Sequence, residues 1–112
     1  MDVTETFFSV DVDDMQRATA FWVAALGAQV LFASPRWSSL RIAGVRVALF
    51  HHPGQPRGRV GLHFVVSDLA AACARVLQAG GRVQTAAIQA APGVVIAVVV
   101  DTEGNEFALR QQ

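Results

Sequence analysis

The chain has 112 residues, of which 53% are hydrophobic, and its nine basic and nine acidic residues leave no net charge. This length suits one compact domain or two small packed modules, and the charge balance excludes a basic nucleic-acid-binding patch and an acidic tail. The single cysteine, Cys73, excludes an internal disulfide. The start of the chain lacks a signal-peptide pattern, and the longest apolar stretch, Val94–Val100, is too short to cross a bilayer, so we expect a cytoplasmic protein with no nucleic-acid or membrane partner.

The first half predicts a strand, a helix and three more strands. Phe8, Val10 and Val12 alternate with the face formed by Phe7, Ser9 and Asp11, which is the period of a strand. A helix follows, capped by Asp13 or Asp14 and ended by Gly27, with an apolar stripe of Met15, Ala18, Phe21, Trp22 and Ala25. Short strands then occupy 28–32, 36–42 and 45–51.

The second half repeats this order after the linker PGQPRG, residues 53–58. In the strand 60–66, one face carries Val60, Leu62, Phe64 and Val66, and the other carries Gly61, His63 and Val65. The next helix is capped by Ser67 or Asp68 and ended by Gly80 or Gly81, with a stripe of Leu69, Ala72, Cys73, Val76 and Leu77. Strands at 82–88, 94–100 and 106–110 complete the pattern.

The two halves are in phase at a shift of 54 residues, which aligns the strand, the capping Asp, the helix and the terminal glycine. The sequence therefore predicts an α+β fold of two βαβββ modules, residues 1–52 and 59–112, within a single domain of residues 1–112. A four-stranded sheet with one helix covers only one of its faces. We expect the two bare faces of the mixed sheets to enclose a cleft.

Three stretches carry a family resemblance: VDVDDMQRATAFWVAALG (Val10–Gly27), HFVVSDLAAACARVLQAGG (His63–Gly81) and VVIAVVVDTEGNEFAL (Val94–Leu109). Together with the paired modules, they resemble the vicinal oxygen chelate superfamily, which includes glyoxalase I, extradiol dioxygenases, fosfomycin-resistance enzymes and bleomycin-resistance binding proteins. The resemblance implies a glyoxalase-like domain over nearly the whole chain. It does not select one function, because one fold hosts many chemistries.

The resemblance implies metal ligands on the first and last strand of each module. These positions hold Phe7, Gly61 and Ala108, and the fourth falls on Ala48 or Phe50. None of these side chains offers the N, O or S donors that zinc, nickel or iron require. We therefore expect no metal and no cofactor.

His63 and Glu106 are polar residues of the second module on the face away from its helix. Counting from Gly61 and Ala108, the strand rise places them roughly 13 Å apart, too far to share a metal. His63 is then a pocket-wall residue, a general base or a structural histidine, and the sequence leaves these three readings open.

The candidate ligand-binding residues are those that alternation places on the bare faces: Phe7, Ser9, Trp37, Arg41, Phe50, His52, His63 and Glu106. Trp37 and Phe50 have no core to enter on that side, which favours ligand stacking or a subunit contact. The charged residues Glu5, Arg46 and Arg110 are read as solvated surface. No catalytic residue is assigned.

These residues favour a metal-independent small-molecule binding protein of the bleomycin-resistance type, whose ligand is a drug or an aromatic metabolite. The alternatives are a lyase or isomerase of the superfamily with a degenerate or absent metal site, and a regulatory interaction module. We expect a homodimer, because the sheets have exposed edges that pairing would cover. The sequence leaves open whether the modules pair within one chain or between two.

Overall fold

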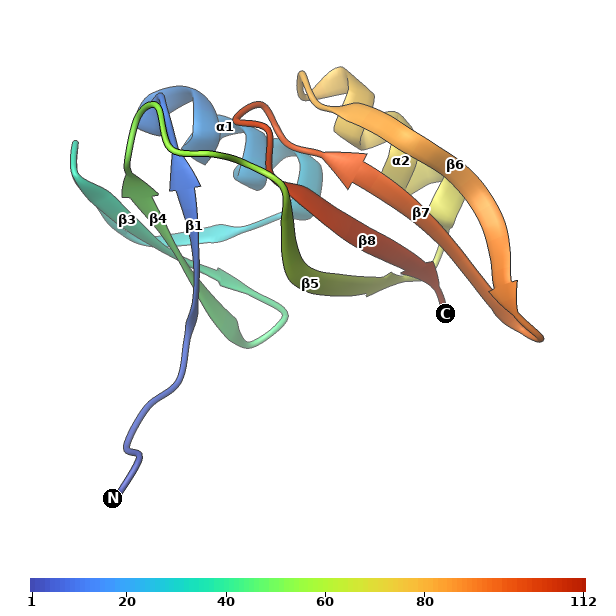
Figure 1. Ribbon diagram of the computed structural model, residues 1–112, viewed down its shortest axis with the longest axis horizontal. Helices are drawn as coiled ribbons and strands as arrows, with labels where there is room; N and C mark the ends of the chain where they lie inside the picture. Colours follow the sequence, from blue (N-terminus) through green and yellow to red (C-terminus); the bar gives the residue numbers. More distant parts are fainter.

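A computed structural model describes residues 1–112 (Figure 1). The first module contains β1 (Phe8–Val12), α1 (Met15–Leu26), β2 (Gln29–Ala33), β3 (Trp37–Ile42) and β4 (Val45–His51). The second contains β5 (Arg59–Val66), α2 (Leu69–Gln78), β6 (Arg82–Ala91), β7 (Val94–Val100) and β8 (Glu106–Gln111). This confirms the predicted strand–helix–three-strand order in both halves, with small shifts at the strand ends.

Each module forms its own mixed sheet. The strand orders are β1-β4-β3-β2 (sheet A) and β5-β8-β7-β6 (sheet B), with β1–β4 and β5–β8 parallel and the other pairs antiparallel. Neither sheet closes into a barrel, and β1 and β5 are edge strands with one side unpaired. In Figure 1 the sheets splay apart, and residues 1–7 extend away from sheet A as an N-terminal arm.

Both helices begin at an aspartate. The carboxylates of Asp14 and Asp68 accept hydrogen bonds from the backbone N–H groups of Arg17 and Ala71, at 2.9 and 3.0 Å, so they satisfy donors that the first turn leaves free. Gly27 ends α1 with a left-handed φ of 65°. α2 ends at Gln78 with Ala79 as its C-cap, and Gly80, one of the two glycines expected to end this helix, follows with a positive φ of 97°. No helix is long and apolar enough to cross a membrane.

One hydrophobic core runs through both modules. It takes its strand residues from the faces that the helices cover, including Val10, Val12, Leu40, Val47, Leu49, Leu62, Ala97, Val99, Phe107 and Leu109. Trp22 of α1 is fully buried and reaches into the second module, where its ring lies 5.6 Å from Phe107 and 6.2 Å from Phe64. Leu77, expected on the apolar stripe of α2, is instead exposed. The modules therefore pack through α1, α2 and this aromatic cluster.

The turn between β7 and β8 in the second module is hydrogen-bonded to the start of α1 in the first. The buried carboxylate of Glu103 accepts hydrogen bonds from the backbone N–H groups of Asp13 and Asp14, both at 2.9 Å. It also accepts two from the Arg17 guanidinium, at 2.8 and 3.0 Å, and one from the Thr102 hydroxyl at 2.6 Å. An acidic group at this end of a helix is also favoured by the helix dipole.

These hydrogen bonds govern how Glu103 responds to acid. Burial works to raise the pKa of the Glu103 carboxyl, but the bonds from Arg17, Thr102 and the backbone outweigh it together and lower this pKa from 4.5 to about 2. The folded protein therefore holds the Glu103 proton less tightly than the unfolded chain does. The resulting stabilisation is complete above pH 4.5 and is lost as the pH falls towards 2.

We predict that Glu103→Gln lowers the free energy of unfolding at pH 7 by about 1–3 kcal/mol, because buried donors lose a charged acceptor. Urea unfolding followed by tryptophan fluorescence measures this loss, with Asp2→Asn as the control for removing an exposed acidic charge. The difference from wild type should shrink at pH 3, where the stabilisation is partly lost. Equal unfolding midpoints at pH 7 would contradict the assignment.

Candidate functional site

Sheet A keeps one face free of helix, and strand register identifies the residues on it. Ser9 and Ser39 both lie opposite Ala48, while Trp37 lies opposite Phe50. Val47 and Leu49, which alternate with these residues, are fully buried on the helix side. The open face of sheet A thus carries the candidates Ser9, Trp37, Arg41, Phe50 and His52. Phe7 precedes β1, and the Arg46 guanidinium lies 4.3 Å from its ring centre.

Four rings form a row across this open face. The ring centres of Phe32 and Trp37 are 4.5 Å apart, those of Trp37 and Phe50 6.4 Å, and those of Phe50 and His52 6.2 Å, with interplanar angles of 14° to 31°. We call Phe32, Trp37, Phe50 and His52 the aromatic strip. Phe32 was not among the sequence candidates, because a register irregularity between Val30 and Phe32 in β2 breaks the simple alternation.

His52 ends the aromatic strip in a polar contact. Its Nδ1 lies 2.7 Å from a carboxylate oxygen of Asp11, and both side chains are exposed. With Nδ1 directed at the carboxylate, Nε2 is the ring nitrogen free to meet a ligand. The sequence placed Asp11 on this face but did not connect it with His52, since the two residues lie 41 positions apart.

The open face of sheet B holds His63 and Glu106. His63 lies opposite Ala108, and a register shift between Arg59 and His63 contains Gly61, whose φ is 72°. The expected separation of roughly 13 Å between His63 and Glu106 was therefore wrong, because it assumed an unbroken strand with Gly61 opposite Ala108. Glu106 is two positions before Ala108, which corresponds to about 6–7 Å of strand.

His63, Glu106 and Ala108 line one small pocket of about 130 Å³ together with Arg59, Ile96 and Val98. A Glu106 carboxylate oxygen accepts a hydrogen bond of 3.0 Å from the side-chain amide of Gln84. This pocket suits a single small polar group.

The donor set of both faces does not fit a transition metal. Phe7, Gly61 and Ala108 stand at three of the implied ligand positions, and Ala48 or Phe50 at the fourth. No three His, Cys, Asp or Glu side chains come together anywhere in the structure. Two donors such as His63 and Glu106 fall short of the four that a closed zinc site uses.

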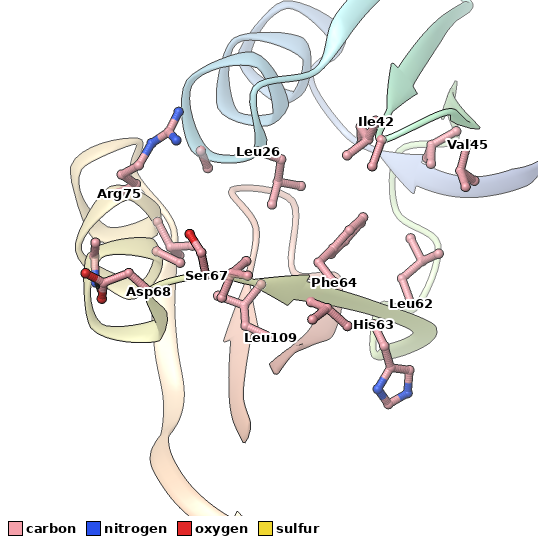
Figure 2. A pocket seen from close by; sticks show the side chains of 18 of the residues that line it. Leu26, Ile42, Val45, Leu62, His63, Phe64, Ser67, Asp68, Arg75 and Leu109 are labelled. Atoms are coloured by element: carbon pink, nitrogen blue, oxygen red, sulfur yellow. Dashed lines mark hydrogen bonds between the residues drawn. The ribbon is translucent and has the colours of Figure 1, made fainter. Parts of the chain in front are cut away.

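The two open faces do not meet within the chain, since no cavity is lined by both the aromatic strip and the His63 pocket. Instead, a groove of about 810 Å³ opens on the helix side, where the modules join (Figure 2). We call it the inter-module groove; its lining is mostly apolar and includes Phe8, Leu26, Ile42, Val45, Leu62 and Phe64. His63 also borders this groove, but in Figure 2 its ring points away from the groove.

The contrast between His63 and Leu62 tests the face assignment. Leu62 is 7% exposed and packs in the core, so Leu62→Ala should cost roughly 2–5 kcal/mol of stability. His63 is exposed, so His63→Ala should leave folding nearly unchanged while weakening ligand binding by about 1–2 kcal/mol. Urea unfolding measures the change in stability. Titration with an aromatic compound that binds the wild type measures the change in affinity. The opposite pattern would mean that β5 is displaced by one residue.

Solved structures share this architecture at low sequence identity. A bleomycin-binding protein complexed with bleomycin matches with a TM-score of 0.70 and 20% identity, covering 98% of this chain and 99% of that one. The fosfomycin resistance protein FosX from Mesorhizobium loti matches at 0.79 and 18%, covering 100% and 94%. Lactoylglutathione lyase from Agrobacterium tumefaciens matches at 0.77 and 14%, covering 99% and 96%. At these identities the matches establish the fold alone.

No curated protein sequence matches the chain. The family model of the glyoxalase-like domain does match, over residues 7–110, which is nearly the whole chain. The paired βαβββ modules and the structural neighbours agree with that match. The chain belongs to the glyoxalase-like domain family.

Proposed function

We propose that this protein binds a flat aromatic small molecule without a metal, as a sequestering protein of the bleomycin-resistance type. The observation that carries the proposal is the aromatic strip on the open face of sheet A. Exposed aromatic rings on a face with no helix supply a stacking surface for another ring. The bleomycin-bound structural neighbour supports small-molecule binding by this fold.

We further propose that two copies complete the site. The edges of β1 and β5 are unpaired, and an unpaired strand edge can form backbone hydrogen bonds with a further strand. If β1 of one copy lies beside β5 of another, the aromatic strip and the His63 pocket face one cleft. The inter-module groove supports this arrangement, because Phe8, Val45 and Val65 border it and are 46%, 44% and 63% exposed.

A lyase or isomerase is the second candidate, and the corrected register favours it more than the sequence did. His63 and Glu106 line one pocket, so a base and an acid would stand close enough to act on one substrate group. Elemental analysis of protein prepared without chelator distinguishes a metal-dependent enzyme from a metal-free enzyme and from a metal-free binding protein. About one zinc, nickel or iron per chain would overturn the metal-independent proposal.

Trp37 provides the test of ligand binding. It is 37% exposed, whereas Trp22 is fully buried, so an aromatic ligand on the open face should quench only Trp37. We predict that quenching by a neutral flat compound such as 1-pyrenebutanol disappears in Trp37→Ala. Phe50→Leu should weaken binding by about 0.5–1.5 kcal/mol, the scale of one aromatic pair. Unchanged quenching in Trp37→Ala would place the ligand elsewhere.

Sedimentation tests the two-copy site. We predict a dimer mass at micromolar concentration for a chain of 11.9 kDa. Val65→Lys places a charge on the exposed β5 residue beside the inter-module groove and should yield folded monomers. Val23→Lys, on the exposed side of α1, is the matched control. A monomer mass for the wild type would exclude the shared cleft.

A further inference from the structure

The open face of sheet A has two chemically different ends. The aromatic strip and the Asp11–His52 contact occupy the end where β4 finishes. At the other end, near the β3–β4 turn, Arg41 lies directly opposite Arg46 on the neighbouring strand. Side chains directly opposite one another on adjacent strands stand about 4.5–5.5 Å apart at Cβ, and like charges in such a pair are destabilising.

The chain only partly compensates for this arginine pair. Arg41 forms no ion pair in the structure, and Arg46 forms one, with Glu5 of the N-terminal arm. The Glu5 side chain is 58% exposed, so this contact contributes little to stability. The Arg46 Nε is buried and has no hydrogen-bond partner. Because the two guanidinium groups have only one weakly held carboxylate between them, they can bind a further anion.

Between the two ends the surface is made of small side chains. Ser9, Ala48 and Ser39 form its middle, and the Ser39 hydroxyl is buried without a hydrogen-bond partner. Ser39 and Ala48 are only 3% and 2% exposed, so a molecule lying along the strands would rest on the larger side chains around them. Phe50 and Arg46 are four residues apart on β4, which is about 13 Å of strand, and the length of the arginine side chain shortens this span.

From this juxtaposition we propose that the ligand is an aromatic acid, whose ring stacks on the aromatic strip and whose carboxylate binds between Arg41 and Arg46. Glu5 then acts as an internal competitor, because its carboxylate occupies Arg46 in the free protein. The Phe7 ring contacts the same guanidinium, with its centre 4.3 Å from the Arg46 Cζ. The inference rests on the proposed function and names the chemical class of its ligand.

Two matched probes separate this inference from the proposed function. 1-Pyrenebutyrate and 1-pyrenebutanol share one flat ring system and differ in the charged group. We expect the wild-type protein to bind the acid about tenfold more tightly than the alcohol, the ratio that corresponds to one charge-assisted hydrogen bond. Raising the salt concentration should weaken binding of the acid and leave the alcohol nearly unchanged.

Variants locate the charged group. Arg41→Gln and Arg46→Gln should each remove most of the preference for the acid, while binding of the alcohol stays within experimental error. Glu5→Gln should tighten binding of the acid about threefold, because an exposed competing ion pair is lost. Arg36→Gln, which removes an exposed arginine without an ion pair, is the control.

Equal affinity of the wild type for the two probes would overturn the aromatic-acid proposal and leave the aromatic strip intact as a binding surface. An equal loss of both probes in the arginine variants would also overturn it. If neither probe binds the wild type, both this inference and the proposed function fail. The salt dependence of the wild type decides the question even if an arginine variant does not fold.

Discussion

The buried carboxylate of Glu103 is the constraint on which the arrangement of the two modules depends. It belongs to the β7–β8 turn of the second module, yet it satisfies the backbone donors at the start of α1 in the first. Asp101 in the same turn accepts a 3.2 Å hydrogen bond from the Trp22 indole, and the Asn105 side chain donates to the Asp11 carbonyl at 2.9 Å. One turn therefore fixes both a helix end and a core tryptophan. With the modules joined in this way, their open faces stay apart.

The two carboxylates of this turn respond to acid in opposite directions. Burial raises the pKa of Asp101, and hydrogen bonds from Asn105, Glu103 and Trp22 oppose this shift without cancelling it. A raised pKa means that the folded state accepts the proton more readily than the unfolded chain, so falling pH relatively favours the fold through Asp101. Glu103, with its lowered pKa, has the contrary effect. Acid sensitivity of the junction between the modules is thus set by the Glu103 contacts with Arg17 and the helix start.

Sequence patterns predicted what is local to a strand or helix. Alternation placed Leu62 on the buried side and His63 on the open side. The sequence also limited each helix cap to one of two adjacent residues, of which Asp14 and Asp68 are the caps. Features that depend on how strands pair were not predicted from the sequence. The bulge at Gly61 moves His63 opposite Ala108, and the irregularity before Phe32 adds a ring to the aromatic strip. The role of Glu103 was also missed, because a turn residue 86 positions from Arg17 gives no sequence signal of the contact.

The buried core and the proposed binding surface use alternate residues of the same strands, and such a division lets one fold carry different site chemistries. In β4, Val47 and Leu49 are fully buried against the helix side, whereas Arg46, Ala48 and Phe50 belong to the open face. A substitution on the open face therefore changes ligand chemistry while the core stays packed. Phe7, Gly61 and Ala108, at the positions where the family resemblance implies metal ligands, lie outside the buried core. In the proposed site, the open face carries aromatic rings at one end and two arginines at the other, and strand register places both.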